Sequence, residues 1–196
     1  MNLPNKLTVL RIAVTPLFLV IFMLPRWISG APALLGILLW ILYLLIEISD
    51  VLDGYIARKY GLVSDLGKVL DPFADVLSRV TYFICFTAVG IMPVVILAIL
   101  LYREFSVTFL RMILIRKGVA MAASIWGKLK AITYALAGVL GLIYITIERS
   151  GLYSEVLTPL LYGVQLVFLL SAIASVLSFL TYYVGALPVL KQTFQE

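Results

Sequence analysis

Four aspartates, Asp50, Asp53, Asp71 and Asp75, lie in stretches of this chain that are otherwise apolar enough to cross a lipid bilayer. An aspartate at the centre of a membrane helix costs about 2.5–3.5 kcal/mol on insertion scales. Four unpaired aspartates would therefore cost on the order of 10 kcal/mol or more. The sequence thus predicts cations at these carboxylates, and divalent ions that also hold a phosphorylated ligand would meet that need.

The composition is that of an integral membrane protein. Of the 196 residues, 63% are hydrophobic and only 13% are charged, whereas soluble domains are about 45–50% apolar and about 25% charged. At this length we expect one compact domain over residues 1–196.

Apolar stretches long enough for a membrane helix predict an all-α fold with six transmembrane helices. They cover residues 8–24, 33–57, 71–91, 93–115, 124–147 and 157–185. Lysine and arginine concentrate near the N-terminus, in the 58–68 loop and in the 111–130 connection. By the positive-inside rule these segments and both termini face the cytoplasm, and the aspartates lie in a polar, metal-containing cavity near that side.

The aspartate spacing predicts a four-carboxylate cage. Asp50 and Asp53 are three residues apart and Asp71 and Asp75 are four apart, so each pair lies on one helix face. Two divalent ions would balance the four charges, and two-metal sites are suited to transferring phosphoryl groups. The chain has no histidine and a single cysteine. Carboxylate oxygens are therefore the main ligands, which suits Mg²⁺, Mn²⁺ or Ca²⁺.

Small and basic residues accompany the aspartates. Gly54 and Ala57 keep their helix slim enough for a bulky ligand, Gly67 opens the approach to the next helix, and Arg58 offers a planar donor fork to a phosphate oxygen. Any one of these residues could instead be a helix cap or a packing residue. Six of the ten acidic residues fall between positions 47 and 75, however, and this clustering favours a site.

The pattern Asp-x2-Asp-Gly-x2-Ala-Arg-x8-Gly-x3-Asp-x3-Asp runs unbroken from Asp50 to Asp75. It resembles the signature of the CDP-alcohol phosphotransferase family. The resemblance implies metal ligation by Asp50, Asp53, Asp71 and Asp75, with Asp75 also the general base. It further implies two Mg²⁺ or Mn²⁺ ions, CDP contacts from Gly54, Arg58 and Ser64, and a homodimer.

A second group of residues is basic. Arg103 and Arg111 lie in the fourth apolar stretch, and Lys128 and Lys130 follow the next connection. An arginine inside the membrane is a functional candidate, so these four cations are predicted to bind an acceptor alcohol that carries a phosphate. Alternatively, Arg103 pairs with Glu104 or with the aspartates, and the lysines serve the positive-inside bias.

Flanking segments resemble the bacterial phosphatidylglycerophosphate synthases, a group within that family. They are Asn2 to Arg11, Arg103-Glu104 and Gly127 to Lys130. Where this group commonly has lysine after the last aspartate, the chain has Val76, and Arg79 could supply the charge instead. The resemblance implies transfer of a phosphatidyl group from CDP-diacylglycerol to glycerol 3-phosphate at the cytoplasmic face of a bacterial inner membrane. Asn5, with Thr8 and Arg11, would reach the nucleotide pocket.

Three other interpretations stay open. The acceptor could be inositol phosphate or serine, or the pair could be CDP-choline and diacylglycerol. Aspartates in membrane helices also form cation pathways in transporters, but here they cluster at one end and the chain shows no internal repeat. Isoprenoid transferases use aspartate–magnesium–diphosphate sites without the Gly-x-x-Ala-Arg insert. Membrane lipids are expected partners, and nucleic acids are not.

Overall fold

The computed structural model describes residues 2–27, 32–119, 124–151 and 153–193. These residues form six α-helices and one short 3-10 helix, so the predicted all-α fold is confirmed. The elements are α1 (Leu3–Met23), η1 (Leu24–Arg26), α2 (Pro32–Lys59), α3 (Asp65–Ala88), α4 (Val94–Arg116), α5 (Ile125–Ser150) and α6 (Ser154–Thr193).

Four of these helices are long and apolar enough to cross a membrane. The qualifying segments are Leu3–Arg26, Ala33–Lys59, Ile125–Ser150 and Ser154–Lys191. α3 and α4 do not qualify, and both carry several charged residues, including Asp71, Asp75 and Arg79 on α3 and Arg103 and Glu104 on α4. The structure therefore supports a multi-pass membrane protein with at least these four candidate spans.

The residues divide into two compact units. One comprises Met1–Val89 with Ile145–Ser154, and the other comprises Gly90–Tyr144 with Glu155–Glu196. The prediction of a single domain over the whole chain stays a prediction.

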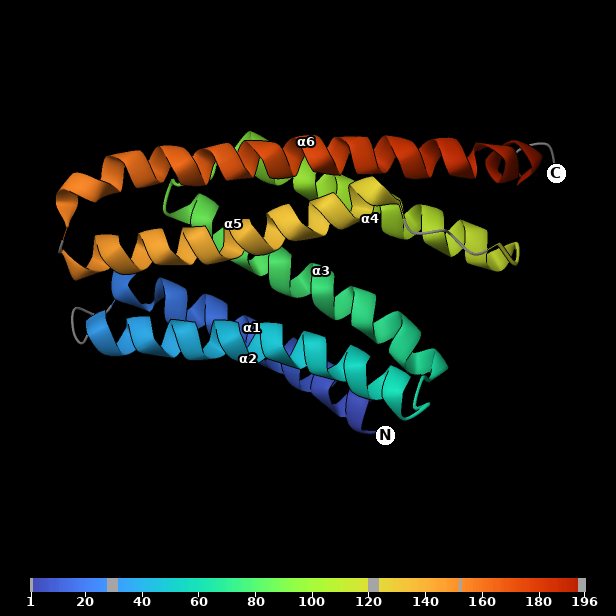
Figure 1. Cartoon of the computed structure of the whole chain (residues 1–196), viewed down its shortest axis with the longest axis horizontal. Coiled ribbons are helices and arrows are strands. Elements are labelled where there is room, and N and C mark those ends of the chain that lie inside the picture. Colours follow the sequence, from blue (N-terminus) through green and yellow to red (C-terminus); the bar gives the residue numbers. More distant parts are fainter. Residues whose placement is uncertain (1, 28–31, 120–123, 152, 194–196) are drawn as a thin grey trace. The chain divides into compact units, whose positions relative to one another are not determined.

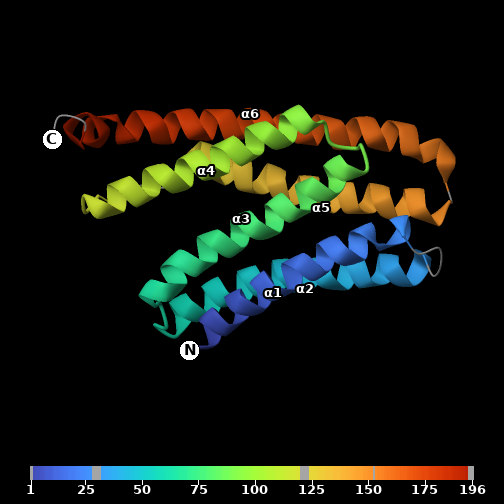
Figure 2. The same ribbon diagram turned by 180° about the vertical axis from the view of Figure 1, so that it is seen from behind.

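An aromatic cluster joins α1, α2 and α3 in the first unit. The ring of Tyr82 on α3 lies 4.9 Å from that of Phe18 on α1 and 5.1 Å from that of Tyr43 on α2, centroid to centroid. All three side chains are buried. Figures 1 and 2 show α1 and α2 lying side by side, with the start of α1 next to the end of α2. This packing gathers the start of α1, the end of α2 and the start of α3 in one region.

In the second unit, α4 and α6 pack through a small apolar cluster. Leu110 and Leu114 of α4 contact Ala186 and Leu190 of α6, and all four are buried. A buried hydrogen bond of 2.8 Å between the hydroxyls of Tyr134 and Ser175 joins α5 to α6. Apolar packing and polar links together hold the three helices of this unit.

Candidate functional site

The connection between α2 and α3 is short and has defined caps. Gly61 has a φ of 65°, a left-handed conformation that favours glycine, and the amide of Leu62 donates to the carbonyl of Ala57 at 2.9 Å. Ser64 caps α3, because its hydroxyl accepts from the amide of Gly67 at 3.0 Å. α3 therefore begins at Asp65, before the predicted start at residue 71, and its first turns carry Asp71 and Asp75.

The four predicted ligand aspartates converge on one guanidinium group, that of Arg11 on α1. Its Nη1 donates to Oδ1 of Asp50 at 2.6 Å and to Oδ1 of Asp75 at 2.5 Å. Its Nη2 donates to Oδ1 of Asp71 at 2.8 Å and to Oδ2 of Asp53. The structure thus brings together the carboxylates that the sequence pattern grouped, and adds a cation from a third helix.

The carboxylates differ in exposure. Arg11 is 1% exposed and Asp53 is 3% exposed, whereas the side chain of Asp71 is 45% exposed. A second cation, Arg79, lies beside this group of carboxylates. Its Nη2 is 3.9 Å from Oδ2 of Asp50. The acidic site therefore has a buried side at Asp53 and a more exposed side at Asp71.

These residues fit a divalent metal ion. Asp50, Asp53 and Asp71 each offer a carboxylate oxygen, and these oxygens lie within 4.8 Å of one another. Among the residues that the structure describes, Oδ1 of Asp53 is buried without a hydrogen-bond partner. A buried carboxylate oxygen with no partner is costly, and coordination to a hard cation would satisfy it.

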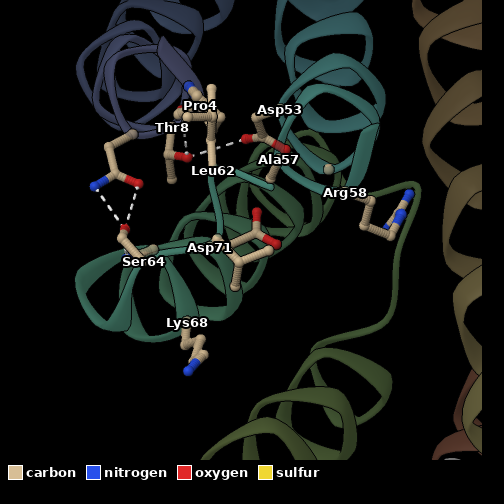
Figure 3. Close-up of a pocket in the computed structure, with 13 residues that line it drawn as sticks. Pro4, Thr8, Asp53, Ala57, Arg58, Leu62, Ser64, Lys68 and Asp71 are labelled. Atoms are coloured by element: carbon tan, nitrogen blue, oxygen red, sulfur yellow. Dashed lines mark hydrogen bonds between the residues drawn. The ribbon is translucent and has the colours of Figure 1, made fainter. Parts of the chain in front are cut away.

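A pocket of about 270 Å³ adjoins the acidic site, and both Asp53 and Asp71 line it (Figure 3). All six residues predicted to bind the CDP-linked lipid also line it, namely Asn5, Gly54, Ala57, Arg58, Ser64 and Gly67. The remaining lining residues are Pro4, Thr8, Leu62, Val63 and Lys68. The sequence pattern thus located this pocket, and the binding role of each residue stays a prediction.

Hydrogen bonds from α1 shape one wall of the pocket. Nδ2 of Asn5 donates to the Ser64 hydroxyl at 3.0 Å, and the Thr8 hydroxyl donates to Oδ2 of Asp53 at 3.0 Å (Figure 3). A Cβ atom on Gly67 would lie 2.8 Å from Oδ1 of Asn5, which is too close for an ordinary contact. Glycine at position 67 therefore permits the close approach of α1 and α3.

The side chain of Arg58 lies against the surface of α2, the helix that carries it. A Cβ atom on Gly54 would be 3.4 Å from Nη1 of Arg58, so the guanidinium folds back over that glycine. Arg58 itself is exposed, and Figure 3 shows its side chain apart from the Asp53 and Asp71 carboxylates. It can therefore reorient toward a phosphate at the pocket.

Arg11 was expected near the nucleotide pocket with Asn5 and Thr8. The structure places Asn5 and Thr8 in the pocket lining and Arg11 among the aspartates. The three residues are spaced by three along α1, which puts them on one face of a mostly apolar helix. That spacing indicates a polar face, but it does not identify the partners of Arg11.

The second unit holds the four cations predicted for an acceptor phosphate. Arg103 and Lys130 are engaged with Glu104, at 3.1 Å and 2.5 Å respectively, and Arg103 also donates to the Ser178 hydroxyl at 2.8 Å. Of the two alternatives for Arg103, pairing with Glu104 is confirmed. Arg111 and Lys128 are exposed, and the Arg111 guanidinium lies 6.0 Å from the ring centroid of Tyr182.

Comparisons with known proteins agree with this geometry. The family model for CDP-alcohol phosphatidyltransferase matches residues 1–186. The chain is 34% identical over 199 aligned residues to the CDP-diacylglycerol–glycerol-3-phosphate 3-phosphatidyltransferase of Treponema pallidum, with 98% of this chain and 92% of the relative covered.

Two further relatives match over part of their length. The CDP-diacylglycerol–glycerol-3-phosphate 3-phosphatidyltransferase of Bacillus subtilis is 37% identical, with 66% of this chain and 70% of the relative covered. A probable phosphatidylglycerophosphate synthase of Mycobacterium tuberculosis is 35% identical, with 69% of this chain and 63% of the relative covered.

Proposed function

Because this chain belongs to the CDP-alcohol phosphatidyltransferase family, we propose that it transfers the phosphatidyl group of CDP-diacylglycerol to sn-glycerol 3-phosphate. The products are phosphatidylglycerophosphate and CMP. The relatives named above carry the name of this reaction or of its product. The structural observation that carries the proposal is the convergence of Asp50, Asp53, Asp71 and Asp75 beside a pocket.

Asp50, Asp53, Asp71 and Asp75 would hold Mg²⁺ or Mn²⁺, and we propose two ions. The ions would supply positive charge to the diphosphate of the donor and to the charge that develops on it during transfer. The unpartnered Oδ1 of Asp53 and the carboxylate-only donor set support this assignment.

The adjoining pocket would bind the cytidine and diphosphate of the donor. Asn5, Ser64 and Thr8 supply polar atoms on one wall, while Gly54 and Ala57 leave room at the surface of α2. Arg58 would meet a phosphate oxygen through its planar donor fork. Gly67 keeps the opposite wall close to α1. Together these residues orient the donor so that its lipid-side phosphorus faces the acceptor.

Asp75 would act as the general base. Its side chain is partly exposed, so a soluble alcohol can reach it. The carboxylate accepts the proton of the acceptor hydroxyl while that oxygen attacks the phosphorus that bears the diacylglycerol. The bond from this phosphorus to the CMP oxygen then breaks, and CMP leaves with the electron pair. General-base catalysis of this kind typically contributes about 10²–10⁴-fold.

Arg103, Arg111, Lys128 and Lys130 would meet the phosphate of the acceptor. One observation favours a second candidate, an acceptor without a phosphate such as serine: the carboxylate of Glu104 already pairs with Arg103 and Lys130. Arg111 and Lys128 are exposed, so a phosphate on the acceptor can reach both side chains. We therefore place glycerol 3-phosphate first.

We also propose that all six helices cross the inner membrane of a bacterium, as a homodimer with the acidic site facing the cytoplasm. Lipids surrounding the apolar faces would be its other partners. The distribution of lysine and arginine supports this orientation. Cysteines introduced near Lys59 or Lys117 should react with reagents on the cytoplasmic side, and cysteines near Arg26 or Glu155 with reagents outside.

The test is CMP release by the purified protein from CDP-diacylglycerol. Release is expected with glycerol 3-phosphate, should stop with EDTA and should return with Mg²⁺ or Mn²⁺. Asp53→Asn is the inactive control. Consumption of serine with no response to glycerol 3-phosphate would instead establish the second candidate.

A further inference from the structure

The guanidinium of Arg11 connects α2 and α3 in a paired arrangement. Nη1 binds Asp50 of α2 and Asp75 of α3, and Nη2 binds Asp53 of α2 and Asp71 of α3. Each terminal nitrogen therefore holds one aspartate from each helix. A single buried side chain of α1 thus supplies the positive charge at the centre of the four carboxylates.

This charge is insufficient by itself. Four aspartates carry a formal charge of −4, so with the single charge of Arg11 the group remains at −3. Nη2 of Arg79 lies 3.9 Å from Oδ2 of Asp50, and even with this second positive charge the total stays negative. The site is therefore held together by Arg11 and still attracts further cations.

The guanidinium of Arg11 is held only through its terminal nitrogens, within the described part of the chain. Among the residues that the structure describes, its buried Nε atom has no hydrogen-bond partner, and the guanidinium donates to the four aspartates through Nη1 and Nη2. If these carboxylate oxygens turn to another cation, no hydrogen bond to any other described residue holds the guanidinium in place.

We propose that Arg11 is an internal competitor for the metal centre: it holds the four aspartates in the absence of metal, and a divalent ion has to displace it from their oxygens. This inference rests on the metal centre of the proposed function. Of the four carboxylates that Arg11 contacts, three also offer oxygens within 4.8 Å of one another as metal ligands, namely those of Asp50, Asp53 and Asp71. A guanidinium and a divalent cation also repel each other, so the two do not share these oxygens without cost.

A supporting role for Arg11 makes the opposite prediction. If Arg11 only orients the carboxylates for the ion, its removal should leave them disordered and weaken metal binding. If it competes, its removal destabilises the metal-free protein more than the metal-bound protein, and metal binding becomes tighter. The sign of the change in affinity decides between the two.

The experiment titrates Mn²⁺ into detergent-purified protein and measures free Mn²⁺ by electron paramagnetic resonance. Arg11→Met keeps an unbranched apolar side chain of similar reach and removes the charge. We expect its Kd for Mn²⁺ to fall by about tenfold or more, which corresponds to about 1.4 kcal/mol. Thermal unfolding should show a larger Mn²⁺-induced rise in Tm for Arg11→Met than for the wild-type protein.

Two further variants complete the test. Lys6→Met removes an exposed cation from the same helix, and its Kd should stay close to that of the wild type. Arg11→Lys keeps the charge on a single nitrogen, which cannot hold both pairs of aspartates, so its Kd should lie between those of the wild type and Arg11→Met. If Arg11→Met does not fold, a Kd for Arg11→Lys below that of the wild type supports the proposal.

An unchanged or raised Kd of Arg11→Met for Mn²⁺ would overturn the proposal. If Arg11→Met does not fold, the same result for Arg11→Lys would overturn it. Failure of the proposed reaction is a separate result. A wild-type protein that binds Mn²⁺ but releases no CMP would contradict the reaction while leaving the role of Arg11 intact. A wild-type protein that binds no Mn²⁺ would overturn both the metal centre and this inference.

Discussion

Nζ of Lys130 on α5 lies 2.5 Å from Oε1 of Glu104 on α4, and both side chains are largely buried. Glu104 also accepts from its neighbour Arg103, so a single carboxylate faces two cations. Arg103 in turn donates to Ser178 on α6. A charged pair and its hydrogen bonds therefore join all three helices of the second unit, in addition to their apolar packing.

Loss of the Glu104 charge should destabilise the second unit. Glu104→Gln leaves Arg103 and Lys130 buried without their counter-charge, and breaking a buried pair in this way typically costs about 3–5 kcal/mol. We expect a lower Tm for thermal unfolding in detergent, partly restored in the double variant Glu104→Gln with Lys130→Met. Glu148→Gln, at an exposed position, is the control and should leave the Tm nearly unchanged. Equal Tm values for both single variants would contradict a structural role for this pair.

The buried aspartate should be indispensable for metal binding. Asp53→Asn removes the charge of the least exposed carboxylate of the four. Changes to residues that merely support metal ligands cost about 10–100-fold in affinity, so we expect at least this loss in Mn²⁺ affinity, with turnover reduced to background. Equilibrium Mn²⁺ binding measures the first effect and CMP release the second. Full activity in this variant would remove Asp53 from the site.

Base catalysis and metal binding should separate at Asp75 and Asp71. Asp75→Asn should lower kcat by about 10²–10⁴-fold, the usual contribution of a general base. It should also retain binding of CDP-diacylglycerol better than Asp71→Asn does, because Asp50, Asp53 and Asp71, whose carboxylate oxygens lie within 4.8 Å of one another, all remain. Direct binding of the labelled donor compares the two variants. An equal loss of donor binding in both would mean that Asp75 serves chiefly as a metal ligand.

The close approach of α1 and α3 should matter for donor binding. Gly67→Ala places a Cβ atom 2.8 Å from Oδ1 of Asn5, so Asn5 has to move and its bonds with Ser64 weaken. Overpacking of this kind typically costs about 1–3 kcal/mol, and the KM for CDP-diacylglycerol should rise. Gly36→Ala on α2 is the control, because no atom lies within 4 Å of its added Cβ. Similar KM values for both variants would show that the pocket tolerates the shift.

Binding of an acceptor that carries a phosphate should depend on the exposed cations of the second unit. Arg111→Ala removes one charge-assisted contact, worth about 1.5–3 kcal/mol or roughly one to two decades. The KM for glycerol 3-phosphate should therefore rise by about this factor, with kcat and the KM for CDP-diacylglycerol nearly unchanged. Arg116→Ala, an exposed cation at the end of the same helix, serves as the control. An identical response of the two variants would remove Arg111 from the acceptor site.

The sequence predicted that the four aspartates lie together, because they come from two helices joined by a short connection. Asp50 and Asp53 lie near the end of α2, and Asp71 and Asp75 lie near the start of α3. Capping at Ser64 also starts α3 earlier than the apolar pattern indicated, because a cap depends on backbone hydrogen bonds and not on hydropathy.

The partners of Arg11 and Arg103 could not be predicted in the same way. Arg11 is 39 residues before Asp50 and 64 before Asp75, so its contacts depend on how three helices pack. Arg103 had two plausible counter-charges in the sequence, its neighbour Glu104 and the distant aspartates. Only the three-dimensional arrangement distinguishes them, since the hydrogen bond to Ser178 on α6 orients the guanidinium within the second unit.

The position of Arg11 has a consequence for how the chain enters the membrane during synthesis. α1 leaves the ribosome first, yet the aspartates that neutralise its arginine lie 39 to 64 residues later. An isolated α1 in the bilayer would carry an arginine that costs about 2.5–3.5 kcal/mol on insertion scales. This penalty would be avoided if α1 stayed in the translocon until α2 and the start of α3 had been synthesised. Such delayed integration would couple the insertion of α1, α2 and α3 through the side chain of Arg11.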